Sequence, residues 1–444
     1  MGKNDDSLIV KRPPEFAPLA TDLNNLEVVS MEGAGVTGVI YTGALTALYE
    51  AGLLDKIRCF AGTSSGSIVA TGAALGYRGK ELEEIALNQN FRAFCQTNLK
   101  WGLRLVSNLN RDGMFSGTEM KRWISSLCAK RVGNADLTFG DLETYKSEAL
   151  KGNKHYFAQK YDEAMTVKNR EACRRMARAK KKAYHFDFEK GSRENSIEKM
   201  MEIAGSFSSL EVAATEIIEE VWLGKQSEKA IVFNGKTSPD LRISFGVRAS
   251  ASYPFIFRHA KFEHEGKERL YTDGGYTNII PIPLRDEHGI ISNRFLGLTS
   301  EYITRDETPS EAMSEKNEGG FLFDLYKNMK DGPQKAIKAA IAWRFGGKVL
   351  SHIKDEEYHT SKKSHSMALA RGFLRMKKDM ERFTVMGDLI RNDTETTKYI
   401  IPLNRNGILA TNFNITNEQK KELIHIAYQM MVNEITRFQD IHPE

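Results

Sequence analysis

Residues 57–75, IRCFAGTSSGSIVATGAAL, decide the fold class that we expect for this chain. The first six form a short apolar run that predicts a strand, and the run from Ser65 onwards is rich in small and apolar residues, as a buried helix is. Between them, Gly62-Thr63-Ser64-Ser65-Gly66 fits G-x-S-x-G, in which a serine sits on a sharp turn from a strand into a helix. The stretch therefore predicts a strand, a serine-bearing turn and a helix.

The neighbouring residues extend this pattern into an α/β fold. Leu26–Met31 is another short apolar run that ends at glycines, and Val39–Ala51 carries apolar residues at helical spacing. The first 75 residues therefore predict the β-α-β-α start of a parallel sheet. Three later segments are strand-like and resume the sheet: Leu210–Thr215, Lys229–Phe233 and Glu268–Thr272.

The domain organisation follows from where this pattern stops. We expect one domain over about residues 20–300, interrupted by a basic helical insertion at 151–205. Residues 301–444 are expected to be mainly helical and to serve as a membrane or partner module. Within this region Ala336–Leu350 mixes aromatic and basic residues and is compatible with an interfacial helix, with core packing as the competing interpretation. Thr416 and Gln419 form a capping box for a final helix over residues 417–437.

Composition alone does not identify the function. The hydrophobic fraction of 41% and the charged fraction of 27% are those of an ordinary globular protein. The first residues lack a secretory signal, and no apolar run is long enough to cross a membrane. We therefore expect a cytoplasmic protein, or one delivered to a cytosol without a Sec-type signal. The four cysteines form no C-x-x-C pair, so we expect reduced, mostly buried thiols rather than disulfides or a zinc site.

Ser64 is the candidate nucleophile. In a G-x-S-x-G turn, the glycines two residues either side let a strained backbone pass close to its neighbours. The position of Ser64 between a strand-like and a helix-like run is the context that this motif requires. The competing interpretation is a serine that only caps the following helix.

A glycine-rich loop, GAGVTG at residues 33–38, follows the first strand. Its G-x-G-x-x-G spacing is also the dinucleotide fingerprint, which predicts a nucleotide-binding oxidoreductase as an alternative. That fold needs an acidic residue at the end of the next strand, whereas the nearest acid here, Asp55, precedes that strand. In a hydrolase, the amides of such a loop would instead stabilise the oxyanion of a tetrahedral intermediate.

Asp273 is the candidate partner of Ser64. It follows the strand-like segment that ends at Thr272, and the two glycines after it give the backbone room to turn. Asp-Gly-Gly is more often only a turn. The alternative is a Ser-His-Asp triad, for which His288 is the first histidine after the acid. His259 and His264 precede Asp273, and we interpret them as exposed loop residues.

Taken in order, four segments resemble the patatin-like phospholipase family. They are the glycine loop with its helix (SMEGAGVTGVIYTGALTALYEAGL), the serine turn (FAGTSSGSIVA), a helix before the last core strand (VRASASYPFIF) and the acidic segment (YTDGGYTNIIPI). The resemblance covers about residues 26–300. It implies a three-layer α/β fold with a mainly parallel central sheet, and a serine hydrolase of lipid acyl esters.

The resemblance also implies roles for individual residues. Ser64 would attack the ester carbonyl and Asp273 would take its proton directly, as a Ser-Asp dyad without a histidine. The amides of the oxyanion hole would be those of Gly33, Ala34, Gly35 and Ser65. No metal or organic cofactor is implied. The substrate would be a glycerophospholipid, cleaved through an acyl-serine intermediate; the need for a protein activator stays open.

Two positions depart from the family loop, which usually reads Gly-Gly-Gly, any residue, Arg or Lys, Gly. Ala34 replaces a glycine, which is a mild change because the hole uses backbone amides. Thr37 replaces the basic residue and removes a cation near the developing charge, so we expect that Thr37→Arg raises activity. A catalytically weak binding protein that keeps the fold is the alternative function.

The formal charge of +5 is unevenly distributed. Residues 151–182 hold eleven Lys or Arg against three acids, which predicts either a solvated helix or a surface for anionic membranes. Few aromatic residues are interleaved with these charges, so nucleic-acid binding is not expected. The membrane-binding candidates are Arg174, Arg175, Arg178, Lys180, Lys181 and Lys182.

Overall fold

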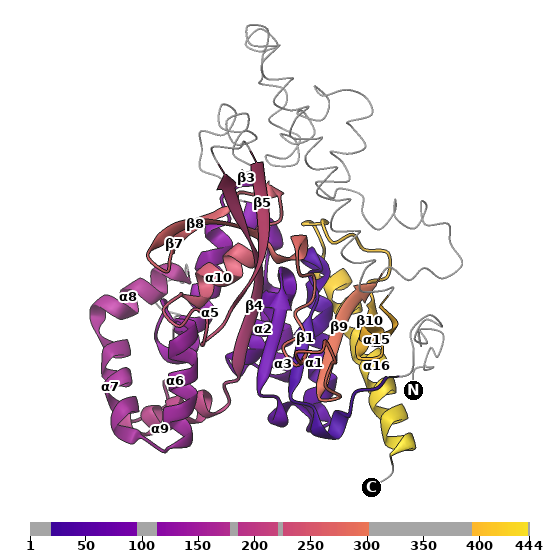
Figure 1. Ribbon diagram of the computed structural model, residues 1–444. Helices are drawn as coiled ribbons and strands as arrows, with labels where there is room; N and C mark the ends of the chain where they lie inside the picture. Colours follow the sequence, from indigo (N-terminus) through magenta and orange to yellow (C-terminus); the bar gives the residue numbers. More distant parts are fainter. Residues whose placement is uncertain (1–18, 96–112, 178–184, 221–224, 302–392, 443–444) are drawn as a thin grey trace, which may run out of the picture.

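The computed structural model describes residues 19–95, 113–177, 185–220, 225–301 and 393–442 (Figure 1). Eight strands of these residues form the main sheet, in the order β10-β9-β1-β2-β4-β8-β7, with β5 also paired to β4. The strands are β1 (Val28–Met31), β2 (Cys59–Thr63), β4 (Ser209–Glu220), β5 (Lys225–Phe233), β7 (Ala260–His264), β8 (Lys267–Asp273), β9 (Phe295–Glu301) and β10 (Ile400–Asn404). A separate parallel pair joins β3 (Gly113–Phe115) to β6 (Phe255–Phe257).

The direction of the strands confirms the predicted α/β class with a mainly parallel sheet. Neighbouring strands run parallel from β10 through β9, β1 and β2 to β4. Beyond β4 the sheet becomes antiparallel, through β8 and β7 and through β5. β1 is buried along its whole length, which is why its sequence reads as a continuous apolar run.

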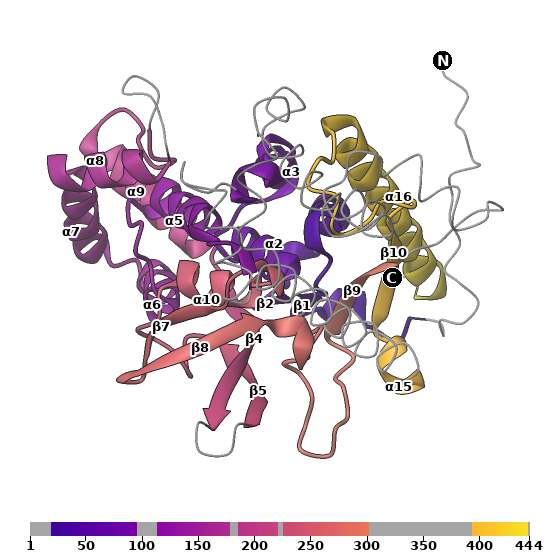
Figure 2. The ribbon, with the colours of Figure 1, turned by 90° about the horizontal axis from the view of Figure 1, so that it is seen from above.

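Helices α2, α3, α10 and α16 lie on one side of this sheet (Figure 2). The other side is covered, within the described residues, by the chain between β8 and β9, where Ile282, Leu284 and Ile291 pack against β1 and β9. The helices outside the basic insertion are α1 (Ile40–Glu50), α2 (Ser65–Ala74), α3 (Gly79–Asn88), α5 (Thr118–Val132), α6 (Phe139–Leu150), α10 (Ile243–Ser250), α15 (Thr394–Thr397) and α16 (Asn417–Ile441). Short 3-10 helices are η2 (Leu23–Asn25), η3 (Gly35–Val39), η4 (Leu54–Lys56), η5 (Phe91–Cys95) and η6 (Gly274–Tyr276).

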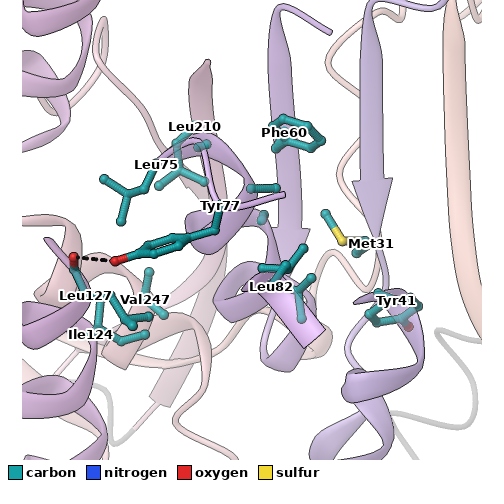
Figure 3. Packing of buried hydrophobic residues seen from close by; sticks show 14 of the residues in the cluster. Met31, Tyr41, Phe60, Leu75, Tyr77, Leu82, Ile124, Leu127, Leu210 and Val247 are labelled. Atoms are coloured by element: carbon teal, nitrogen blue, oxygen red, sulfur yellow. Dashed lines mark hydrogen bonds between the residues drawn. The ribbon is translucent and has the colours of Figure 1, made fainter. Parts of the chain in front are cut away.

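The core between the sheet and the helices is closely packed (Figure 3). Tyr77 is fully buried, and its hydroxyl donates to the Leu127 carbonyl at 3.1 Å. This bond satisfies a polar group that would otherwise be left unpaired in an apolar interior. Three of the four cysteines are buried and Cys59 is half-buried, which agrees with the expectation of mostly buried thiols.

The basic insertion is helical, with α7 (Lys154–Met165), α8 (Val167–Met176) and α9 (Arg193–Gly205). Among the described residues of the basic block at 151–182, four Lys or Arg side chains form ion pairs, three of them with glutamates outside that block. The pairs are Lys151–Glu148, Lys154–Glu198, Lys160–Glu163 and Arg170–Glu189. In the folded protein this block is therefore less positive than its sequence suggests. Arg174 and Arg175 lie in the last turn of α8, whereas Arg178 and Lys180–Lys182 lie outside the described residues.

The end of the chain joins the main sheet. The segment Ile400–Asn404 forms β10 and pairs with β9, and α16 packs along α1. Sequence reasoning missed β10 because a five-residue apolar run next to charged helical patterns carries little signal of its own. The capping box of Thr416 and Gln419 is confirmed, and α16 ends at Ile441 rather than at 437. The segment Ala336–Leu350 lies outside the described residues.

Contact between α1 and α16 gives a stability prediction. A Cβ at Gly43 would lie 2.0 Å from the Ile424 carbonyl oxygen, so Gly43→Ala must push the two helices apart. We expect Gly43→Ala to lower the free energy of unfolding by about 1–3 kcal/mol, although alanine favours a helix. Gly205→Ala is the matched control, because the nearest atom to its Cβ would be 4.0 Å away. Urea unfolding measures both, and a Gly43→Ala variant as stable as the control would contradict this packing.

Candidate active site

The main sheet brings Ser64 and Asp273 together through the strands that precede them. β2 runs parallel to β4 and ends where Thr63 lies opposite Ala213. β8 runs antiparallel to β4 and ends where Asp273 lies opposite the next residue, Ala214. Since β5 pairs with both of these β4 residues from the other side, β2 and β8 must share one edge of β4. The two strand ends therefore meet, and Ser64, the residue after β2, lies beside Asp273.

The turn at Ser64 is strained and tightly packed. Ser64 has φ 51° and ψ −123°, a conformation that non-glycine residues rarely adopt and that costs about 1–3 kcal/mol. The two flanking glycines allow it: a Cβ at Gly62 would lie 2.4 Å from the Gly66 carbonyl carbon, and one at Gly66 would lie 2.3 Å from the Met31 oxygen. The structure thus has the turn that the G-x-S-x-G pattern predicted, with α2 beginning at Ser65.

A second serine holds this turn in place. The Ser64 amide donates to the Ser250 hydroxyl at 2.8 Å, and the Ser67 hydroxyl donates to the Ser64 carbonyl at 2.6 Å. Ser250 is the last residue of α10 and belongs to the segment VRASASYPFIF. The sequence analysis predicted a helix for that segment but did not identify Ser250 as a functional residue. The signal was present, since a buried serine in a helix needs a hydrogen-bond partner.

Asp273 is fully buried, and its backbone is fixed on both sides. Its Oδ1 accepts from the Gly275 amide at 2.9 Å, its carbonyl accepts from the Thr215 hydroxyl, and its amide donates to the Ser252 carbonyl. Among the described residues, no hydrogen bond reaches Oδ2. Hydrogen bonds of catalytic groups are often long before substrate binds, and Oδ2 is the oxygen left to receive a proton.

Burial changes the acidity of this carboxyl group. It raises the pKa of Asp273 from 3.8 to about 7, although the Gly275 amide and the Ser64 hydroxyl each lower it. Removal from water disfavours the charged form, and here that effect is the largest. A carboxylate with a pKa near neutral is a far stronger base than an exposed aspartate, and it is still largely ionised above pH 7.

Two of the four predicted oxyanion donors already have acceptors. The Gly33 amide donates to the Ile279 carbonyl at 3.2 Å, and the Ala34 amide donates to the Ser65 hydroxyl at 2.9 Å. Gly35 and Ser65 are each the first residue of a helix, η3 and α2, where an amide has no intrahelical acceptor. In the described part of the chain no other group accepts from these two amides.

Thr37 cannot be replaced by a larger cation without disturbing this loop. Its side chain is fully buried, and its hydroxyl donates to the Ala34 carbonyl at 2.7 Å, with the Ser300 hydroxyl at 3.4 Å. An arginine at this position would lose the internal hydrogen bond, and its longer side chain would have to displace buried neighbours. These contacts argue against the expected gain in activity, and we now expect Thr37→Arg to disrupt the glycine loop. An assay of the variant decides between the two expectations.

A cavity of about 470 Å³ contains Ser64, Asp273 and the glycine loop in its wall. Most of the rest of the wall is apolar and comes from several elements, including Val36, Ile68, Phe91, Met120, Ile256 and Phe413. Its charged residues, within the described part of the chain, are Glu32, Asp273 and Arg405. A cavity of this kind accommodates a largely apolar ligand with a few polar groups.

The histidines of the described residues lie outside this site. Among the described residues that line the cavity, none is a histidine. The His288 side chain is 75% exposed and lies next to Glu287 on the surface, so it does not reach Ser64 or Asp273. His264 was expected in an exposed loop, but it lies half-buried in β7. Its ring makes hydrogen bonds with the Tyr271 and Ser238 hydroxyls, which is a structural role.

Curated relatives match short parts of the chain. YqhO of Bacillus subtilis, an uncharacterized protein, is 34% identical over 120 residues, which cover 25% of this chain and 38% of the relative. The triacylglycerol lipase ptl3 of Schizosaccharomyces pombe is 41% identical over 75 residues, which cover 17% of this chain and 14% of the lipase. The matches thus span well under half the length of these relatives.

Solved structures resemble the chain over a larger part of its length but at low identity. VipD from Legionella pneumophila has a TM-score of 0.44 at 13% identity, with 94% of this chain and 68% of VipD covered. The complex of ExoU and SpcU from Pseudomonas aeruginosa gives 0.39 at 14% identity, with 94% and 52% covered.

A family model decides the assignment. The model of the patatin-like phospholipases matches residues 29–285, which is more than half of the chain. That range contains the glycine loop, the serine turn and the strand that ends at Asp273. The chain therefore belongs to the patatin-like phospholipase family.

Proposed function

We propose that this protein hydrolyses acyl esters of glycerophospholipids, with Ser64 as nucleophile and Asp273 as general base. The observation that carries the proposal is the meeting of β2 and β8 on one edge of β4. It sets a strained serine beside a buried carboxylate of raised pKa, in a mostly apolar cavity. Family membership supports a lipid acyl ester as the substrate.

The reaction takes two steps. The Ser64 oxygen attacks the ester carbonyl carbon while its proton passes to Oδ2 of Asp273. The amides of Gly35 and Ser65 stabilise the oxyanion of the tetrahedral intermediate, which then expels the alcohol, protonated by Asp273, and leaves an acyl-serine. Water attacks the acyl-serine, Asp273 takes the proton of the water, and the fatty acid leaves as Ser64 recovers its proton.

Fixed groups of the chain prepare both steps. The Ser250 hydroxyl and the Ser67 hydroxyl hold the backbone of Ser64, and the Gly275 amide orients the Asp273 carboxylate. The Ser65 hydroxyl holds the Ala34 amide, which keeps the glycine loop next to the serine turn. Groups that are held in place before reaction need no reorganisation in the transition state.

The apolar wall of the cavity fits an acyl chain. Val36, Ile68 and Phe91 belong to this wall, and their apolar side chains would exclude water from a bound acyl chain. The experiments below distinguish this function from two alternatives. One is a lipase for neutral acylglycerols, as the name of the partial relative ptl3 suggests, and the other is a weakly active binding protein.

The first test removes the nucleophile and the base separately. We expect Ser64→Ala and Asp273→Asn each to reduce kcat for hydrolysis of a phospholipid or of a soluble ester by at least about 10³-fold. The double variant should be no worse than either single one, because the two groups act as a unit. A Ser64→Ala variant with a tenth of the wild-type turnover would contradict the proposal.

Stability provides the control for Asp273→Asn. The pKa of Asp273 is higher in the folded than in the unfolded protein, so the free energy of unfolding of the wild type falls as the pH rises from about 4 to about 7. Above about pH 7 the loss is complete and amounts to up to about 4 kcal/mol. Asparagine cannot ionise and avoids this loss. The inactive variant should therefore unfold at a higher temperature than the wild type at pH 8, with the difference vanishing near pH 4.

The pH profile gives an independent prediction. The base acts only when ionised, so log kcat/KM should rise with slope one as the pH increases and level off above an apparent pKa of about 7. Hydrolysis of an uncharged soluble ester, measured from pH 5 to 9, reports this ionisation in the free enzyme. A profile that is already level at pH 5 would mean that Asp273 is not the base.

We also propose that the basic insertion contacts anionic membranes, through Arg174, Arg175, Arg178, Lys180, Lys181 and Lys182. Within the described residues, the ion pairs of Lys151, Lys154 and Lys160 leave these three lysines less able to attract a bilayer. Attraction by the six candidate residues should therefore dominate and should weaken as salt screens it.

Co-sedimentation with anionic vesicles tests this proposal. Replacing the six candidates by Gln should reduce the bound fraction several-fold at low salt, whereas Lys151→Gln, Lys154→Gln and Lys160→Gln together should change it little. Hydrolysis of a soluble ester should survive in both variants. Equal loss of binding in the two variants would contradict a specific role for residues 174–182.

A further inference from the structure

One wall of the cavity comes from the end of the chain. Arg405, Ala410 and Phe413 line it, although they follow β10, far in sequence from the serine turn. The Val36 amide donates to the Ala410 carbonyl at 2.7 Å, so this segment is bonded directly to the glycine loop. The cavity is therefore complete only when β10 is added to the sheet.

The position of Arg405 is set by rigid structure. β10 is buried along its length and pairs with β9, so the backbone that leads into Arg405 is fixed. After it the chain turns at once: the Asn406 amide donates to the Asn404 side chain at 2.8 Å, and the Ile408 amide donates to the Arg405 carbonyl at 3.0 Å. Groups carried by regular elements are held more accurately than groups on long loops.

Arg405 is the basic residue among the described residues that line this cavity. Of the charged residues in its wall, within the described part of the chain, Glu32 and Asp273 are acidic and Arg405 is basic. The glycine loop provides no cation, because Thr37 stands at the position where one would be expected and is bonded inside the loop. The Glu32 carboxylate accepts from the Ser300 amide at 3.0 Å and is held at the end of β9.

We infer that Arg405 binds the phosphodiester of the lipid headgroup and so selects phospholipids over neutral acylglycerols. A guanidinium can donate two parallel hydrogen bonds to phosphate oxygens in a fixed planar geometry. The phosphate of a glycerophospholipid lies only a few bonds from the ester that Ser64 attacks, whereas a diacylglycerol has no anion there. This inference rests on the proposed function and names the residue that determines its substrate class.

The test compares two lipids with the same acyl chains, dioleoylphosphatidylglycerol and dioleoylglycerol, in mixed micelles of one neutral detergent. Fatty-acid release gives kcat/KM for each lipid. For Arg405→Gln, the ratio of the phospholipid value to the diacylglycerol value should fall by about 10- to 100-fold, the effect of one lost bond to a charged group. Arg405→Lys keeps the charge and should recover part of that ratio.

Arg437→Gln is the matched control. Arg437 lies on α16 and pairs with Glu434, away from the cavity, so its removal should leave the ratio at the wild-type value. An unchanged ratio in Arg405→Gln would overturn the inference. An equal loss on both lipids would also overturn it, because Arg405 would then act in the chemical step rather than on the headgroup.

A binding measurement separates this inference from the proposed function. In the Ser64→Ala background, calorimetric titration with soluble dihexanoylphosphatidylglycerol requires no turnover. Adding Arg405→Gln should raise the Kd at least tenfold, and an unchanged Kd would overturn the inference. If the wild type hydrolyses neither lipid, the proposed function fails, and this titration still decides whether Arg405 binds the phosphate.

Discussion

The shared edge of β4 is the constraint on which the site depends. A single strand accepts β2 in parallel along its first half and β8 antiparallel along its second half, so the ends of the two strands must meet. β5 closes the other edge and prevents either strand from pairing elsewhere. Ser64 and Asp273 are each the residue at such a strand end, and the distance between them is therefore fixed by sheet register rather than by loops.

Both residues lower the stability of the fold. Ser64 is held at positive φ, and burial raises the pKa of the Asp273 carboxyl group, so its ionised form is disfavoured. The surrounding structure offsets these costs with a continuous buried core and with hydrogen bonds at the two strand ends, where the Ser250 hydroxyl accepts and the Ser67 and Thr215 hydroxyls donate. Strain and raised pKa values that persist in a packed core are typical of functional sites.

Sequence alone predicted those parts that are local in the chain. The apolar run before Gly62, the small residues after Ser64 and the strand before Asp273 each carry their own signal, so β2, α2 and β8 were expected correctly. The sequence did not predict the parts that depend on pairing between segments far apart in the chain. These are β10, the contribution of Arg405 and Phe413 to the cavity, and the antiparallel direction of β8 against β4. The charge count over residues 151–182 overstated the local positive charge, because Glu148, Glu189 and Glu198, which pair with basic residues of that range, lie outside it.

Covalent labelling measures most directly whether Ser64 is a nucleophile that Asp273 activates. The full-length protein, treated with a fluorophosphonate ester and digested, should carry the label on the peptide that contains Ser64, as located by mass spectrometry. The labelling rate should rise with pH through about 7, following the ionisation of Asp273, and should fall at least about 10³-fold in Asp273→Asn. Labelling at another residue, or at Ser64 with an unchanged rate in Asp273→Asn, would contradict the account.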